Sequence, residues 1–191
     1  MDLILASTSP YRRKLLEQLG LPFRCVAPGV DEAEVQSQVA EPPALAERLA
    51  RAKAEAVFAR HPDAVVIGSD QLVAFQGRAL GKPGTEDRAV EQLLAMAGRE
   101  HQLITAVALA DRDGVEVATN IARLWLRPLG AEEAQRYVEA DRPLDCAGSY
   151  KIESLGITLF DRIEASDQTA IVGLPLLTVC RMLRARGFEL P

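Results

Sequence analysis

The first stretch whose residue types could do chemistry is STSPYRR, residues 7–13. The hydroxyls of Ser7 and Ser9, with the backbone N–H groups of a helix start, can hold an anion, and Arg12 and Arg13 add charge-assisted hydrogen bonds. Two arginines at the positive end of a helix are unfavourable unless something negative lies between them. The stretch therefore predicts phosphate binding without a P-loop pattern. The alternative is a capped surface helix with two solvated arginines.

A carboxylate interrupts the apolar stretch AVVIGSDQLVAF, residues 64–75. Asp70 lies in its middle, where a carboxylate is costly unless it has a partner or a function. We interpret it as a general base or metal ligand held by a rigid strand, and the alternative is a hydrogen-bonded Asp at a strand end. Asp31 and Glu32 precede an expected polar loop. With Asp70 they could form an all-oxygen Mg²⁺ or Mn²⁺ site, because magnesium typically takes one or two protein carboxylates plus substrate phosphates.

Two further stretches carry polar groups between glycines. Lys82, in LGKPGT, suits close approach to a phosphate chain, although an exposed turn lysine is the simpler interpretation of this stretch alone. The segment CAGSYKIESLG, residues 146–156, predicts a loop that presents Tyr150, Lys151 and Glu153. Loops on a rigid scaffold often carry recognition.

Composition limits the possible partners of these groups. The net charge of −5 gives no basic field for a nucleic-acid polymer, so an RNA-binding module is not expected. No apolar run approaches the roughly 18 residues needed to span a bilayer. The three cysteines are scattered, without CxxC spacing, which indicates a reducing compartment, the cytoplasm, and argues against a zinc site.

The elements that position these groups alternate between strands and helices. The expected strands lie at 3–6, 22–28, 64–75 and 158–166, with a hairpin over 101–129 that turns at Asp113-Gly114. The expected helices lie at 9–20, 41–61, 85–98, 130–141 and 174–187. Ser9 is the expected N-cap of the first helix, and the charges of the second fit ordinary surface ion pairs. We expect an α/β fold with a mixed sheet.

These stretches resemble, in the same order, motifs of the Maf family of nucleoside triphosphate pyrophosphatases. The matching segments are ASTSPYRR, VDE, GSDQ, GKP, GREHQLIT and AGSYKIESLG…VGLPL, and the similarity covers essentially the whole chain. It implies an ITPase-like (Maf/HAM) α/β fold, a mixed central sheet with flanking helices, as a single domain 1–191 with two lobes around a deep cleft, usually in a homodimer. It also implies metal-dependent cleavage of a nucleoside triphosphate between the α and β phosphates.

The resemblance also implies roles for individual residues. It makes Asp70 the proton acceptor, with Lys82 and Glu32 also catalytic. It places a divalent cation, Mg²⁺ or Mn²⁺, on Glu32 and Asp70. The phosphate contacts fall on Ser7, Ser9, Arg12 and Arg13.

Two departures from the family pattern resemble a branch that acts on 7-methyl-GTP. Tyr11 stands where many relatives have Arg, Glu153 stands where many have Gln, and the third specificity position falls at Gln71. The cationic 7-methylguanine ring would gain a cation–π energy of about 0.5–2 kcal/mol on Tyr11. A carboxylate at Glu153 can accept from the guanine N1–H and the exocyclic amine together. The alternatives are a dTTP/UTP pyrophosphatase of the same family and a non-enzymatic, nucleotide-binding regulator of septum formation.

Overall fold

The described residues of this computed structural model, 2–190, form a mixed sheet. Its strands are β1 (Asp2–Leu5), β2 (Arg24–Cys25), β3 (Ala64–Phe75), β4 (Arg78–Leu80), β5 (Glu100–Asp111), β6 (Gly114–Leu126) and β7 (Phe160–Glu164). The strand order is β2-β1-β3-β5-β6-β7, and β4 pairs with β3. β1 is parallel to β2 and β3, whereas β4 and β7 are antiparallel to their partners. The predicted β3 and the predicted hairpin are confirmed.

The helices follow the predicted order, with two additions. They are α1 (Pro10–Glu17), α2 (Glu32–Gln38), α3 (Pro42–Phe58), α4 (Glu86–Met96), α5 (Ala131–Asp141), α6 (Gln168–Val172) and α7 (Leu176–Ala185), with short 3₁₀ turns η1 (Ala147–Ser149) and η2 (Leu155–Leu159). As predicted, the Ser9 side chain accepts the Arg12 N–H and caps α1. No helix among the described residues is long and apolar enough to cross a bilayer.

The polar loop expected after Asp31 is wrong, because α2 begins there. The Asp31 carboxylate accepts the N–H groups of Ala33 and Glu34, which is an N-cap. The loop expected at residues 146–156 contains η1 and the start of η2, and its Tyr150 is buried instead of presented to solvent.

The chain divides into two compact units. The first unit comprises Met1–Gln71, Ile104–Asn120 and Asp167–Pro191, and the second comprises Leu72–Leu103 and Ile121–Ser166. The first therefore holds β1, β2, α1, α2, α3, α6 and α7, and the second holds β4, β7, α4 and α5. β3, β5 and β6 each contribute residues to both units.

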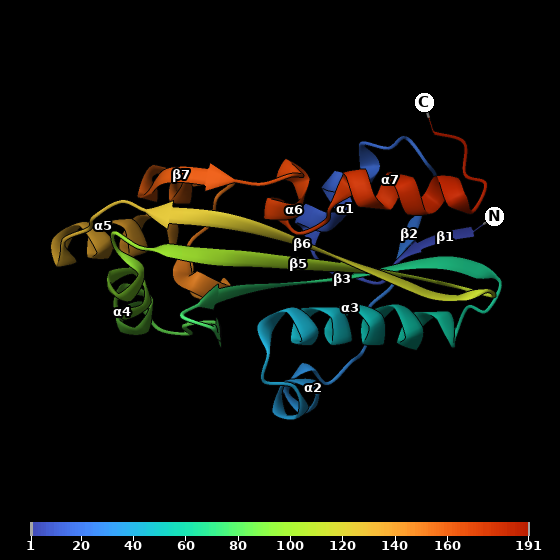
Figure 1. Cartoon of the computed structure of the whole chain (residues 1–191), viewed down its shortest axis with the longest axis horizontal. Helices are drawn as coiled ribbons and strands as arrows, with labels where there is room; N and C mark the ends of the chain where they lie inside the picture. The colour runs from blue at the N-terminus through green and yellow to red at the C-terminus, as the bar shows by residue number, and fades with distance from the viewer. Residues whose placement is uncertain (1, 191) are drawn as a thin grey trace. The chain divides into compact units, whose positions relative to one another are not determined.

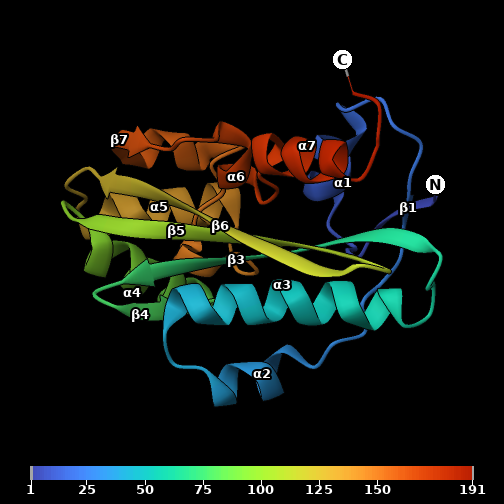
Figure 2. The same ribbon diagram turned by 45° about the vertical axis from the view of Figure 1, so that its right-hand side comes forward.

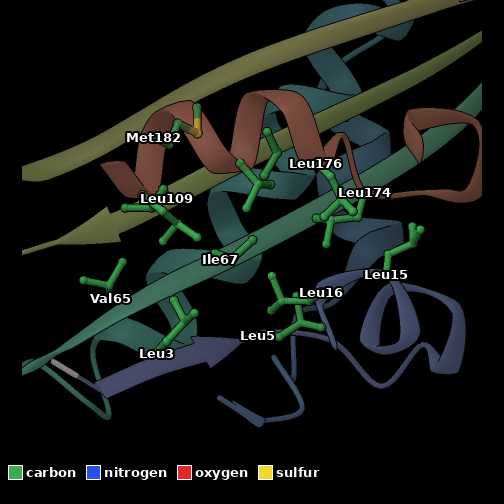
Figure 3. Packing of buried hydrophobic residues seen from close by; sticks show 13 residues of the cluster. Leu3, Leu5, Leu15, Leu16, Val65, Ile67, Leu109, Leu174, Leu176 and Met182 are labelled. Carbon is green, nitrogen blue, oxygen red and sulfur yellow. The ribbon is translucent and has the colours of Figure 1, made fainter. Parts of the chain in front are cut away.

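The first unit buries both faces of its part of the sheet. In Figures 1 and 2, α3 lies along one face, whereas α1 and α7 lie on the other. Side chains alternate along a strand, so Val65 and Ile67 of β3 join the cluster under α7 while Val66 is buried on the α3 side. Figure 3 shows Leu3 and Leu5 of β1 in the same cluster. These residues form the packed core that holds the first half of β3 in place.

The second unit has a small core that contains an aromatic cluster. The helices α4 and α5 pack against each other. The rings of His101, Tyr150 and Phe160 are in mutual contact, and His101 Nε2 shares a 3.0 Å hydrogen bond with the Tyr150 hydroxyl. His101 Nδ1 is buried without a partner among the described residues. Burial lowers the pKa of His101 to about 4, so this ring is neutral near pH 7.

The buried histidine predicts a pH-dependent stability. In the unfolded chain the His101 pKa is near 6.5, so its stabilisation is complete above that pH and falls as the pH drops towards 4. We expect the free energy of unfolding to lose about 3 kcal/mol over this range from His101. Urea unfolding at several pH values measures it. His101→Phe should flatten the curve, whereas His61→Gln, at the other histidine, should not. Equal slopes for the wild type and His101→Phe would contradict the prediction.

Candidate active site

Asp70 lies in the middle of β3, as the sequence predicts, and it is 5% exposed. Its Oδ1 accepts a hydrogen bond of 2.6 Å from Lys53 Nζ, whereas its Oδ2 is buried with no partner among the described residues. Burial raises the pKa of Asp70 above the ordinary value of a carboxyl, and the positive charges of Lys53 and Arg12 oppose that shift. A buried carboxylate oxygen without a partner is expensive, so this atom is the strongest sign of a ligand in the first unit.

Lys53 joins the two acids that the sequence singled out. Its ammonium lies 2.6 Å from Asp70 Oδ1 and 2.7 Å from Glu32 Oε1. The side chains of Lys53 and Asp70 are 7% and 8% exposed, whereas that of Glu32 is 49% exposed. Glu32 of α2, Lys53 of α3 and Asp70 of β3 therefore form one line of charges, which runs from the buried Asp70 to the exposed Glu32.

Gly68 permits this close approach of α3 to β3. A Cβ at Gly68 would lie 2.4 Å from the Ala50 carbonyl oxygen and 2.7 Å from the Ala54 nitrogen, both in the backbone of α3. The helix therefore contacts the strand almost backbone to backbone. Lys53, next to Ala54 in the chain, can then place its ammonium on the carboxylate two residues after Gly68.

Sequence reasoning missed Lys53, because the charges of this helix were interpreted as ordinary surface ion pairs. That interpretation holds for Arg51 with Glu55, but Lys53 is buried. The missed signal is its position in the apolar stripe of α3. The buried residues of that stripe are Leu45, Ala46, Leu49, Ala50, Lys53, Ala54 and Val57. A lysine at a core position needs an anion.

The two arginines of α1 have different environments. Arg12 donates from Nε to the Gly173 carbonyl at 2.9 Å, and the same carbonyl accepts the Ser69 hydroxyl at 2.9 Å. Burial lowers the pKa of Arg12, and the charges of Asp70 and Glu32 oppose that shift, so Arg12 belongs electrostatically to the acidic groups. Arg13 is exposed and pairs with Glu17, one turn further along the helix, at 3.0 Å.

The remaining predicted residues of α1 and its cap lie beside Arg12. Ser7 is buried, and its Oγ accepts the Ser9 N–H at 3.1 Å. Ser9 is the N-cap of α1, and its hydroxyl oxygen accepts a hydrogen bond from the Arg12 N–H at 3.4 Å. Tyr11 is 44% exposed, which is unusual for a large aromatic side chain and suits a ring-stacking surface.

Gln71 turns to the face of β3 opposite to Asp70. Its Nε2 donates to Thr105 Oγ1 at 2.9 Å and to the carbonyls of Ala170 and Ile171 at 2.8 and 3.1 Å. Because carbonyls only accept, these contacts determine which end of the amide is nitrogen. The Gln71 donors therefore hold α6, and only its carbonyl oxygen is left for the specificity role predicted from the sequence.

Lys82 and Glu153 belong to the second unit. Lys82 is exposed in the link between β4 and α4. Glu153 is exposed between the two 3₁₀ turns. The neighbouring Lys151 is not a phosphate ligand in this arrangement, because its ammonium donates to the carbonyls of Asp141 and Arg142 at the end of α5, at 2.8 and 3.2 Å.

The donor set suits a hard divalent cation that brings its own further ligands. Among residues 2–190 no group of three or more His, Cys, Asp or Glu side chains converges on one point. Asp70 and Glu32 supply two carboxylates that share Lys53, and the buried Asp70 Oδ2 lacks a partner within the described part of the chain. Two carboxylates plus substrate oxygens are a typical Mg²⁺ set, so these residues fit the ion.

Comparison with known proteins agrees with this picture. The family model described as "Maf-like protein" matches residues 2–186. A protein of Xanthomonas campestris named "7-methyl-GTP pyrophosphatase" is 52% identical over 190 residues, covering 99% of this chain and 98% of the relative. A protein of Pseudomonas aeruginosa with the same name is 45% identical over 192 residues, covering 100% and 99%.

A solved structure confirms the fold. The HAM1 protein from Coxiella burnetii matches with a TM-score of 0.51 at 12% identity, covering 97% of this chain and 99% of that one. The ITPase-like, HAM-type α/β fold predicted from the sequence is therefore correct. Since a family model spans nearly all of its length and relatives share about half of its residues, the chain belongs to the Maf family.

Proposed function

We propose that this chain is a nucleoside triphosphate pyrophosphatase that hydrolyses 7-methyl-GTP to 7-methyl-GMP and diphosphate. The observation that carries the proposal is the shared name of relatives 45–52% identical over nearly their whole length. The site supports the same class of reaction, because it combines a buried carboxylate on a rigid strand with cations. Phosphoryl transfer depends mainly on positioning and on electrostatic stabilisation.

Each group in the first unit has a task in this reaction. Asp70 orients the attacking water with its Oδ2, which has no partner among the described residues, and takes up a water proton as the new P–O bond forms. The P–O bond to the leaving diphosphate then breaks. Lys53 holds Asp70 through the other carboxylate oxygen, and its positive charge opposes the rise in the pKa of Asp70. Arg12, together with Arg13, stabilises the negative charge that accumulates on the phosphates.

A divalent cation, Mg²⁺ or Mn²⁺, completes the proposed site on Glu32 and Asp70. When bound, it supplies Lewis-acid charge to the phosphate oxygens. Lys53 already pairs with both carboxylates, and Arg12 adds a second positive charge near them. The cluster therefore has little net negative charge with which to attract a metal ion before the nucleotide binds. The proposal also implies a cytoplasmic enzyme, where nucleotide pools lie, and a homodimer, which sedimentation would register.

The base is the part of the substrate that Tyr11 and Glu153 would select. Both side chains are exposed, Tyr11 on α1 and Glu153 between the 3₁₀ turns. A carboxylate accepts from the guanine N1–H and its exocyclic amine, whereas the two carbonyls of a uracil or thymine edge would repel it. This chemistry favours 7-methyl-GTP over the alternative substrates dTTP and UTP. A sensor without hydrolysis is distinguished by the absence of diphosphate release.

Replacing the proposed base should abolish turnover without unfolding the chain. Asp70→Asn keeps the shape, and Lys53 retains Glu32 as its partner. We expect kcat for 7-methyl-GTP to fall by at least about a hundredfold, the usual contribution of a general base. Diphosphate release and a thermal melt measure this, with the exposed Asp63→Asn as a control. Native turnover by Asp70→Asn would remove Asp70 from the mechanism.

Glu153→Gln should change base selectivity. The amide can donate to a pyrimidine carbonyl and no longer accepts two guanine N–H groups. We expect the ratio of kcat/KM for 7-methyl-GTP over UTP to fall roughly tenfold or more. A panel with 7-methyl-GTP, GTP, UTP, dTTP and CTP measures it, with Glu132→Gln on the exposed start of α5 as the matched control. Identical ratios in both variants would refute the base-reading role.

Removing the internal cation should strengthen metal binding without nucleotide. Lys53→Met keeps the length of the side chain but leaves the carboxylates of Asp70 and Glu32 without their shared ammonium. We expect Mn²⁺ to bind the nucleotide-free variant at least about tenfold more tightly than the wild type. The electron paramagnetic resonance signal of free Mn²⁺ reports this affinity. Arg51→Met, on the exposed side of α3, removes the same charge and should have no effect, whereas equal affinities in Lys53→Met and wild type would exclude the competition.

A further inference from the structure

One glutamine in the second unit holds two loops at once. Gln92, on α4, donates from Nε2 to the Gly81 carbonyl at 3.0 Å, and its Oε1 accepts the hydroxyl hydrogen of Ser149 at 2.6 Å. The Gly81 contact alone orients the amide, because a carbonyl can only accept. Gly81 immediately precedes Lys82, and Ser149 stands four residues before Glu153. Gln92 therefore ties the segment of the phosphate lysine to the segment of the base-reading carboxylate.

The Ser149 end of this link is a strained turn. Ser149 is fully buried and has φ +61°, in the left-handed region that is unfavourable for a residue with a side chain. The preceding Gly148 has φ +76°, and a Cβ there would lie 2.9 Å from Val73 Cγ2. Such a backbone persists only where its surroundings over-determine it. The hydrogen bond to Gln92 is one of those constraints.

The chain beyond the turn is anchored on both sides of the base-reading carboxylate. Before it, Tyr150 is buried against His101, and the Lys151 ammonium donates to the Asp141 carbonyl at 2.8 Å. After it, Ser154 donates from its hydroxyl to Asp141 Oδ1 at 2.6 Å. The segment that carries Glu153 is therefore held in one arrangement, and the Gln92–Ser149 hydrogen bond is the first of the bonds that hold it.

The Lys82 segment contacts the same region a second time. The Gly84 N–H donates to the Leu144 carbonyl at 3.0 Å. This backbone bond holds the end of the segment next to α4, and Gln92 holds its beginning at Gly81. Lys82 lies between these two supports and is itself exposed. The support at Gly81 is a side chain, so it can be changed by mutation.

We propose that Gln92 is a positioning residue that sets the Lys82 segment and the Glu153 segment in register with each other. The Gln92 amide then links the segment that would bind phosphate, at Lys82, to the segment that would recognise the base, at Glu153. This inference deepens the proposed pyrophosphatase function and rests on it.

Steady-state kinetics of the full chain with 7-methyl-GTP and UTP, with Mg²⁺ present, test the proposal. Gln92→Leu removes both hydrogen bonds. We expect kcat for 7-methyl-GTP to fall roughly three- to tenfold, the value of one neutral hydrogen bond, and the 7-methyl-GTP/UTP ratio of kcat/KM to fall by a similar factor. Gln135→Leu is the matched control, because this exposed glutamine of α5 bonds to Glu139 and should leave both quantities unchanged.

Two further variants separate the arms of the link. Gln92→Glu keeps an acceptor for the Ser149 hydroxyl but cannot donate to Gly81, so kcat should fall while the selectivity ratio is retained. Ser149→Ala keeps the Gly81 bond and loses the other, so the selectivity ratio should fall more than kcat. If Gln92→Leu does not fold, as judged by circular dichroism, these two variants decide the question.

The possible outcomes are distinct. If the wild type releases no diphosphate from 7-methyl-GTP, the proposed function fails before any variant is measured. If the wild type is active and Gln92→Leu matches Gln135→Leu, the inference is overturned. It is also overturned if Gln92→Leu lowers kcat with the selectivity ratio unchanged, because Gln92 then serves the Lys82 segment alone.

Discussion

The buried ion pair between Lys53 and Asp70 is the constraint on which the first unit depends. Both side chains are under a tenth exposed, and neither charge could be buried alone without a penalty of several kcal/mol. The pair requires α3 to contact β3 at backbone distance, which Gly68 allows because a Cβ there would collide with the helix. One carboxylate oxygen of Asp70 is then left over, buried and with no partner among residues 2–190. The packing of α3 on β3 thus leaves Asp70 Oδ2 as the atom that can act on a ligand.

In the second unit, hydrogen bonds hold the backbone around the proposed functional side chains, with neutral partners at Gln92 and charged ones at Lys151 and Asp141. Its proposed functional side chains, Lys82 and Glu153, are exposed, and the surrounding backbone is held by Gln92, by the Gly148-Ser149 turn and by the aromatic cluster. The buried charges of the first unit and the hydrogen-bonded Glu153 segment of the second suit different demands of the proposed reaction. Phosphate chemistry needs concentrated charge, whereas reading a base edge needs donors and acceptors at fixed positions.

Local signals predicted most of the elements correctly. The strand at 64–75, the Ser9 helix cap and the hairpin were all visible, because caps, turns and periodicity act within a few residues. The error at α2 is instructive. This helix buries none of its residues, so periodicity gave no signal, and only the Asp31-x-x-Glu34 pattern of a capping box could have indicated it.

The family motifs, the alternation of the longer strands and helices, and the position of Asp70 in an apolar strand all follow from the amino-acid sequence. Tertiary structure alone decided which charge meets that carboxylate, since Lys53 lies 17 residues away and the pairing depends on how α3 packs across β3. It also separated Arg12, beside the buried acids, from Arg13, paired with Glu17 on the surface. Adjacent residues on a helix point about 100° apart, so packing assigns neighbours in sequence to different environments.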